Sequence, residues 1–167
     1  MTYYVSNLLG AQPIANTETT QKHALGTLVK ANDPTYGEGE FIYLLGVAST
    51  VVGSVVKYNA TTYQTALLSV TNGKNKGVPV AVAMSANVAS QYGWYQVSGN
   101  AVVKKTTVAV TPQVPIFISA TDGRIKVLAS AGQQIIGAQT ANLTTVVTTT
   151  STVVVTINRP STQTQIT

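Results

Sequence analysis

The sequence predicts an all-β protein, either a small β-barrel or a β-sandwich, with an extended N-terminal arm. Two observations carry this prediction. Val and Thr are abundant while Glu, Lys and Leu are scarce, so intrinsic propensity favours strands over helices. Short runs of β-branched and aromatic residues also recur at spacings of roughly 8–12 residues, with turn-forming residues between them, which is typical of sandwiches and barrels.

The chain divides into three predicted segments. Residues 1–24 are polar, contain Pro13 and show neither helical nor strand periodicity. This pattern predicts either an extended arm that becomes ordered against a partner or a frayed terminus, and in both cases the folded domain does not need it. Residues 25–158 carry the strands of one β-barrel or β-sandwich domain. Residues 159–167 are polar and are predicted to form a flexible tail.

The predicted strands are short and are separated by turn sequences. Asp33-Pro34 followed by Gly37 is one such turn, and the pair Asn72-Gly73 lies in a predicted exposed loop at residues 71–77. One short helix is allowed at residues 87–91 or 140–143. The strands are predicted at residues 25–30, 40–47, 53–58, 63–68, 78–84, 94–98, 101–104, 106–110, 116–119, 125–128, 133–138 and 145–157.

A weak internal repeat is also present. Residues 83–87 (AMSAN) and 138–142 (AQTAN) share three identical residues, and Ser in the first is Thr in the second. Each segment follows a predicted strand. The pair indicates either a duplicated strand–turn unit within the domain or a chance match in a sequence of biased composition.

Charge is scarce. Only 9% of the 167 residues are charged, and the formal net charge is +5. Uncharged Thr, Ser, Gln and Asn replace the missing charges, which suits a protein that stays in contact with neighbours better than a freely diffusing monomer. The positive balance favours an acidic partner or serves solubility alone. Cysteine is absent, so neither a disulfide nor a thiolate metal site can form.

The residues needed for an active site are nearly missing. His23 is the single histidine and lies in the predicted arm, away from any held nucleophile. Four of the five acidic residues fall within residues 18–40, where Glu38 and Glu40 alternate with glycine and favour a solvated role over an acid/base pair. Asp33 and Glu38 lack the spacing of a calcium site. We therefore predict a non-enzymatic protein without catalytic, cofactor-binding or metal-binding residues.

Nucleic-acid binding is a minority interpretation. It would require aromatic side chains on a basic face. A tryptophan in a small all-β domain is more often a core anchor, and dispersed basic pairs are usually solvated strand edges. We therefore expect no specific nucleic-acid partner. The candidate residues are Lys74 with Lys76, Lys104 with Lys105, Arg124 with Lys126, and the aromatic residues Tyr92, Trp94 and Tyr95.

Membrane and secretion signals are not recognisable in the sequence. No stretch reaches the roughly 18 consecutive apolar residues of a membrane helix. The first residues lack the basic start and apolar centre of a secretory signal. We expect a protein that is made in the cytoplasm and has no membrane partner.

Short glycine-containing strand motifs follow one another in a fixed order. They are GVA at residues 46–48, GSVVKY at 53–58, GVPVAVA at 77–83, WYQVSG at 94–99 and IIGA at 135–138. In this order, over residues 25–158, they resemble the decoration (cement) proteins of tailed-bacteriophage capsids. Pro79 and the Thr-rich tract at residues 144–156 depart from the pattern of that family.

The resemblance implies a structural virion protein on the outer surface of an icosahedral capsid. Its partner would be the major capsid protein, adjacent subunits of which it would cement, and it would form a homo-oligomer, with a trimer favoured. The arm would lie across neighbouring capsid subunits. The alternative is a receptor- or glycan-binding module of a phage fibre or tail. A small hydrolase or lyase is disfavoured by the scarcity of acids and histidine.

Overall fold

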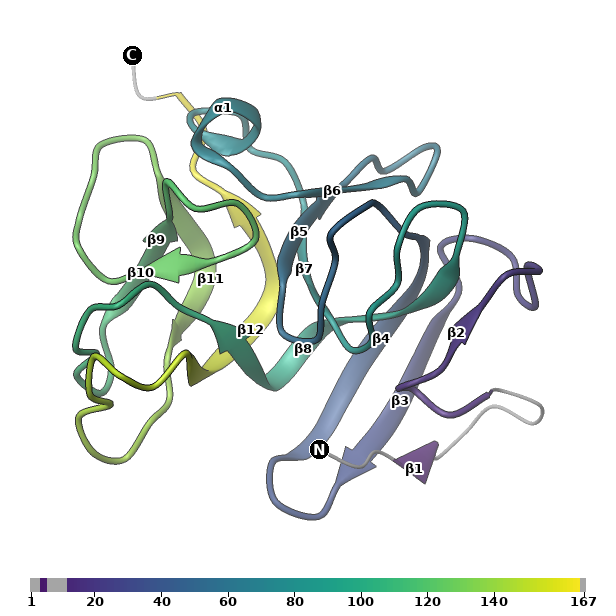
Figure 1. Ribbon diagram of the computed structural model, residues 1–167, viewed down its shortest axis with the longest axis horizontal. Coiled ribbons are helices and arrows are strands. Elements are labelled where there is room, and N and C mark those ends of the chain that lie inside the picture. The colour runs from purple at the N-terminus through teal and green to yellow at the C-terminus, as the bar shows by residue number, and fades with distance from the viewer. Residues whose placement is uncertain (1–3, 6–11, 166–167) are drawn as a thin grey trace.

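The computed structural model describes residues 4–5 and 12–165 and confirms an all-β fold (Figure 1). The paired strands are antiparallel, and one short helix, α1 (Val70–Gly73), accompanies them in the described part of the chain. The strands are β1 (Tyr4–Val5), β2 (Thr17–Glu18), β3 (Leu28–Asp33), β4 (Gly37–Leu45), β5 (Val55–Tyr58), β6 (Thr65–Leu67), β7 (Val80–Ala83), β8 (Tyr92–Lys104), β9 (Pro115–Ile118), β10 (Ile125–Lys126), β11 (Gln134–Thr140) and β12 (Thr152–Thr162).

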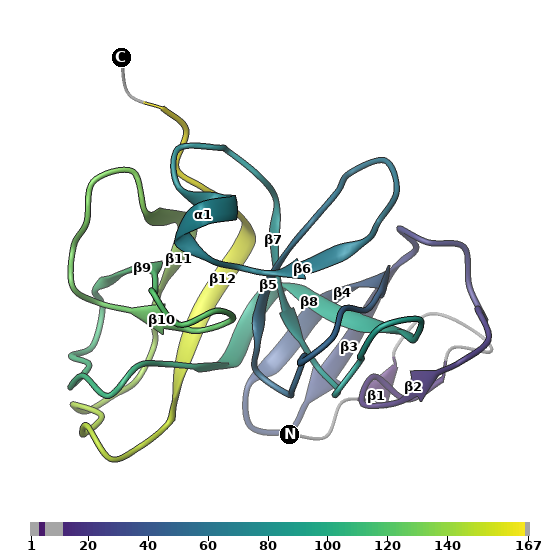
Figure 2. The same ribbon diagram turned by 45° about the horizontal axis from the view of Figure 1, so that its top comes forward.

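The sheet curls into two units that share β8 (Figures 1 and 2). In the first unit the strand order is β4-β8-β7-β5-β6, and a parallel bridge between Leu45 and Gln64 brings β6 back to β4. In the second unit the order is β8-β12-β11-β9-β10, and a parallel bridge between Lys105 and Ile125 brings β10 back to β8. Each unit is therefore a small curled sheet closed at one end.

The second unit repeats the first strand for strand. β4, β5, β6, β7 and the first half of β8 correspond to the second half of β8, β9, β10, β11 and β12, and every strand pairing has its counterpart. The registers agree as well: Tyr58 pairs with Thr65, and Ile118 pairs with Ile125 60 positions later. The domain therefore contains a duplicated five-strand unit.

Backbone conformation supports the same correspondence. Four pairs of residues with positive φ are separated by 60 positions: Gly53 with Gln113, Tyr63 with Gly123, Gly77 with Gly137, and Gly99 with Arg159. The weak repeat in the sequence, residues 83–87 and 138–142, lies at the ends of the equivalent strands β7 and β11 but does not match the structural register. Gly53 donates to the Ala83 carbonyl oxygen and Gln113 to that of Thr140, so Ala83 is equivalent to Thr140 and not to Ala138. The duplication thus extends over two whole curled units and is not limited to one strand and its turn.

One apolar core joins the two units. Val55, Leu68 and Val80 of the first unit lie in the same buried cluster as the inward side chains of β8 to β12, including Ile118 and Val155. This shared cluster explains why two small units form a single body. A second cluster fills the first unit, and its members are Ile42, Leu44, Val56, Ala81, Ala83, Tyr95 and Val97.

The segment predicted as an arm is partly built into the body. Among its described residues, β2 pairs with β8, and Ile14 is buried in a third cluster with Tyr43 and Trp94 on the outer face of β4 and β8. The ring of His23 lies 5.2 Å from that of Tyr43 and 5.4 Å from that of Trp94. Removing residues 12–24 would therefore uncover buried aromatic surface. The rest of the predicted arm, apart from β1, lies outside the described residues.

Two predicted turns differ from the structure. Residues 71–77 do not form a hairpin loop, because the Ser69 hydroxyl accepts a hydrogen bond from the Asn72 amide and the Asn72 side chain accepts one from the Ser69 amide, which caps α1. The Gly99-Asn100 step does not end a strand, since β8 runs through it with Gly99 at φ 95°. The helix allowed at residues 87–91 or 140–143 is absent: residues 87–91 and 141–143 connect strands, and Thr140 ends β11.

The C-terminal strand also differs in extent. β12 begins at Thr152 and continues to Thr162, so residues 159–162, placed in a tail from the sequence, are part of the sheet. Thr162 is buried and its hydroxyl accepts a hydrogen bond from the Val78 amide. The end of β12 is held in the sheet because it pairs with Ile135 and Ile136 of β11. Ile135 is buried and Ile136 is exposed, and this alternation sets the register.

The passage of β8 from one unit to the other leads to a stability prediction. Gly99 and Gly37 both have positive φ, which strains any residue with a side chain. A Cβ at Gly99 would also lie 2.5 Å from the Glu38 carbonyl oxygen, whereas a Cβ at Gly37 would meet nothing within 4 Å. We expect Gly99→Ala to lower the free energy of unfolding by about 3 kcal/mol and Gly37→Ala by about 1 kcal/mol. Urea unfolding measures both, and equal losses in the two variants would contradict this role of Gly99.

Candidate functional site

The second unit exposes a surface without ionisable side chains. Residues 106–121 and 127–158, which we call the charge-free lobe, contain no Asp, Glu, Lys, Arg or His. The large apolar side chains exposed on this lobe are Val108 (40%), Leu128 (70%), Ile136 (46%), Leu143 (96%) and Val147 (57%). Large exposed apolar side chains mark a candidate contact surface where they gather in one patch.

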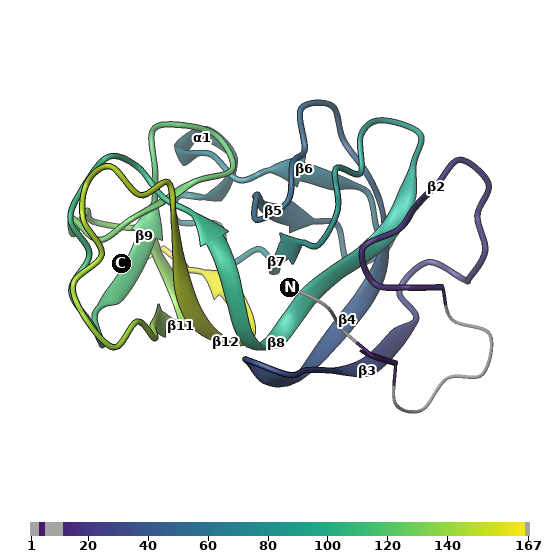
Figure 3. The same cartoon turned by 60° about the horizontal axis from the view of Figure 1, so that its bottom comes forward.

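Two adjacent connections form one end of this lobe, and we call them the tip: residues 106–113 and 141–151 (Figures 1 and 3). Val110 and Val146 exchange two backbone hydrogen bonds of 2.9 Å. The side-chain amide of Asn142 donates hydrogen bonds to the backbone carbonyl oxygens of Val110 at 3.1 Å and Thr144 at 2.7 Å. The tip is therefore a braced structure that holds its exposed apolar side chains in place.

A hollow of about 330 Å³ lies on the same lobe, between β9, β11 and β12. Its polar lining consists of amide and hydroxyl side chains, among them Gln134, Gln139, Thr156 and Asn158. Such a surface can form hydrogen bonds with backbone or amide groups of another protein but cannot transfer protons at neutral pH. The side chains of this hollow are therefore suited to hydrogen bonding with another protein.

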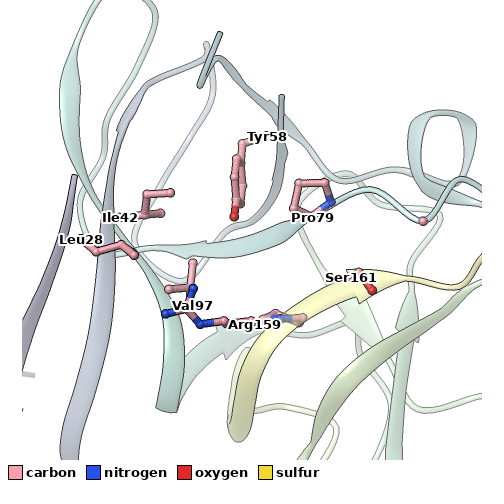
Figure 4. Close-up of a pocket in the computed structure, with 9 residues that line it drawn as sticks. Leu28, Ile42, Tyr58, Pro79, Val97, Arg159 and Ser161 are labelled. Atoms are coloured by element: carbon pink, nitrogen blue, oxygen red, sulfur yellow. The ribbon is translucent and has the colours of Figure 1, made fainter. Parts of the chain in front are cut away.

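A second hollow, of about 230 Å³, lies where the two units meet (Figure 4). Leu28, Ile42 and Val97 give it an apolar wall, while Tyr58, Arg159 and Ser161 are its polar side chains. Burial raises the pKa of the Tyr58 hydroxyl above its usual value, and the nearby Arg159 guanidinium opposes that rise. Tyr58 is therefore a neutral hydrogen-bonding group at neutral pH, and the hollow suits an apolar side chain of a partner.

The acidic residues singled out in the sequence do not converge. Glu38 pairs with Lys30 at 3.1 Å and Glu40 with Arg159 at 2.9 Å. The Asp33 carboxylate accepts hydrogen bonds from the backbone amides of Thr35 at 2.8 Å and Tyr36 at 3.0 Å. It therefore stabilises the turn before β4. Among residues 4–5 and 12–165, no three His, Cys, Asp or Glu side chains come together as metal ligands would.

Several basic candidates are tied to the body. The Arg124 guanidinium donates to the Lys105 carbonyl oxygen at 3.1 Å, and the Lys126 ammonium donates to the Ser130 hydroxyl at 2.7 Å. Lys105 is only 1% exposed, and its ammonium donates to the Val108 carbonyl oxygen at 2.9 Å. Lys74 and Lys76 remain exposed after α1.

The aromatic candidates are located mainly in the interior. Trp94 and Tyr95 are fully buried, and Tyr92 is half-buried beside Tyr43, with ring centroids 6.3 Å apart. Side chains in these positions cannot stack on nucleic-acid bases. What sequence reasoning missed is the charge-free lobe, although the two long stretches without charge were visible as its signal.

Comparisons with family models, with curated proteins and with solved structures find no match to this chain. Within the described residues, no helix has the length and apolar character to cross a membrane. The chain's own surface is therefore the basis for assigning its function.

Lys105 provides a prediction about pH. Burial lowers its pKa below the usual 10.5, so in the range between that lowered pKa and 10.5 the unfolded chain binds more protons than the folded one. The folded state therefore gains stability as pH rises through this range. We expect the unfolding free energy of the wild type, minus that of Lys105→Met, to increase from neutral pH to pH 10.5. Chemical unfolding at several pH values measures it.

The control for this measurement is Lys104→Met, at the half-exposed neighbouring position. This variant removes the same kind of side chain from a position that is not buried, so it accounts for the loss of one lysine as such. A Lys105→Met difference that is flat over the same range would contradict the energetic cost assigned to the buried ammonium.

Proposed function

We propose that this chain is a non-enzymatic structural virion protein that binds the outer surface of an icosahedral phage capsid and cements adjacent capsid subunits. The observation that carries the proposal is the charge-free lobe, which exposes large apolar side chains on a braced surface. Such a surface is favourable when covered and unfavourable when left in water. The partner in this proposal is the major capsid protein.

Cementing follows from a simple thermodynamic argument. A protein that binds only the assembled shell stabilises it over separated subunits, in the same way that a ligand stabilises a folded state. Repeated weak contacts add through effective concentration when the protein is itself oligomeric, and a trimer at a symmetry axis would serve this purpose. The resemblance of the strand motifs to capsid decoration proteins supports the same proposal.

A rival function is a receptor- or glycan-binding module of a phage fibre or tail. Sugar-binding surfaces usually display aromatic side chains, and here Trp94 and Tyr95 are buried. The surface apolar groups of the charge-free lobe are aliphatic instead. This difference favours protein contact, and retention of the chain on a glycan array would favour the rival.

Removing part of the N-terminal segment tests the proposal. Residues 12–24 are packed against Trp94 and should be kept, so the deletion takes residues 1–11 only. We expect this variant to remain folded and to bind purified capsids at least about tenfold more weakly, a loss of roughly 1.4 kcal/mol, because the leader reaches neighbouring shell subunits. Co-sedimentation with capsids lacking the protein measures binding.

The matched control replaces residues 1–11 with a Gly/Ser segment of equal length, which separates the role of the sequence from that of the added mass. Both variants should unfold cooperatively. Binding of the deletion variant equal to that of the wild type would remove the leader from the proposal, and absence of any wild-type binding to capsids would refute the proposal itself.

A further inference from the structure

The hollow between the two units contains a residue that departs from the duplication (Figure 4). Tyr58 ends β5, and its equivalent in β9 is Ile118, since each pairs with the first residue of the strand that follows. Ile118 is fully buried in the apolar core, whereas Tyr58 is half-buried and lines the hollow. The first unit therefore has a phenolic hydroxyl at an opening where the second unit is packed.

Arg159 is a second departure at the same hollow. Its equivalent in the first unit is Gly99, and both residues have positive φ, 43° for Arg159 and 95° for Gly99. Glycine suits this conformation, whereas arginine is strained in it, and the proline that follows Arg159 favours extended backbone instead. An arginine held in a strained conformation at this position indicates a role for its side chain.

The ion pair of Arg159 with Glu40 does not explain the strain. One guanidinium nitrogen lies 2.9 Å from a Glu40 carboxylate oxygen, and the two side chains are 61% and 27% exposed. Exposed ion pairs of this kind contribute little to stability. The pair instead fixes the guanidinium at the edge of the hollow, where its other N–H groups have no acceptor among the described residues.

The polar side chains of the hollow are hydrogen-bond donors that face an apolar wall. The guanidinium can only donate, and the hydroxyls of Tyr58 and Ser161 make no hydrogen bond to another described residue. Figure 4 shows the Tyr58 hydroxyl directed toward Val97 and Arg159. A ligand that matches this surface has an apolar body and an end that accepts hydrogen bonds.

Size and charge narrow the class of ligand. The volume of about 230 Å³ is below the range of about 300–1,000 Å³ that is typical of sites for drug-sized ligands, so the ligand is small. A guanidinium binds a carboxylate more strongly than a neutral acceptor. Because the Glu40 carboxylate lies on the same guanidinium, a ligand with one negative charge is repelled less than one with two.

We propose that this hollow binds a carboxylate on a short aliphatic body, which is either a free small acid or the C-terminal residue of a polypeptide. The carboxylate accepts hydrogen bonds from the Arg159 guanidinium and the Tyr58 hydroxyl, and the aliphatic body packs on the wall formed by Leu28, Ile42 and Val97. Glu40 is a positioning residue that orients the guanidinium. The inference goes beyond the proposed function and does not depend on capsid binding.

The test is a titration of the full chain with isocaproate, followed by isothermal calorimetry and by NMR of the backbone amides. We expect saturable binding, with shifts centred on Gly77, Val97 and Ser161, which line the hollow. Isocaproamide has the same shape without the charge and should bind at least about tenfold more weakly.

A second titration distinguishes the two sources of the carboxylate. It uses the tripeptide Gly-Gly-Leu with a free or an amidated C-terminus. Binding of the free tripeptide, but not of the amide, would assign the site to the end of a polypeptide. Binding of isocaproate without binding of the tripeptide would assign it to a free small acid.

Arg159→Gly separates a role in binding from a role in folding. The variant has at this position the residue of the first unit, so its unfolding temperature should equal or exceed that of the wild type. Its binding of isocaproate should be at least about tenfold weaker, because the charge-assisted hydrogen bonds are lost. Tyr58→Phe keeps the shape of the hollow and should weaken binding by a smaller factor. The control is Lys74→Gln, which removes an exposed cation after α1 and should bind as the wild type does.

Three results would overturn the inference: no saturable binding of either probe, equal binding of isocaproate and isocaproamide, or wild-type binding by both Arg159→Gly and Tyr58→Phe. Capsid binding is measured separately in the co-sedimentation assay. Its absence would contradict the proposed function and leave the carboxylate site intact.

Discussion

Strand β8 belongs to both curled units, and the remaining architecture depends on this sharing. Its first half pairs with β4 and its second half with β12, with Ser98 in both ladders. The change of partner occurs next to Gly99, which adopts φ 95° where a side chain would collide with the Glu38 carbonyl oxygen. Since one strand is common to the two units, they cannot move independently, and the apolar cluster between them stays closed to water.

The shared strand also separates two kinds of surface. The outer face of the first unit is aromatic and is covered by the chain's own residues, among them Ile14 and Val29. Among residues 4–5 and 12–165 no comparable segment covers the tip of the second unit, whose exposed large apolar side chains are aliphatic. The two copies of the duplicated unit therefore differ: the outer face of the first is covered by the same chain, and the tip of the second is accessible to a neighbouring molecule. This asymmetry agrees with a protein that acts by contact.

Much of the fold was predictable from local sequence. β4, β5 and β7 lie where runs such as EFIYLLGV and VPVAVA predicted strands, because β-branched and aromatic side chains suit a buried sheet. The continuity of β8 was not predictable, since Gly99-Asn100 has the composition of a turn and only the long-range pairing keeps it extended. Helix α1 depends on a reciprocal Ser69–Asn72 cap, which a loop-like composition conceals.

The site was less accessible to sequence reasoning than the fold. Trp94 is buried, as the preference for a core anchor predicted, but the burial of Lys105 was not predictable, because the pairing of distant strands decides which face of a strand meets the core. The duplication was not readable from the sequence, since equivalent positions such as Gly99 and Arg159 share a backbone conformation and not a side chain. The long stretches without charge were readable, but their gathering on one lobe required the topology.

The central claim is that this molecule acts by being built into a shell. The most direct measurement is its copy number in purified virions, obtained by quantitative mass spectrometry relative to the major capsid protein. The account predicts many copies in a fixed ratio to the shell protein, as the symmetry of an icosahedral surface requires. Only a few copies per particle, or none, would contradict it.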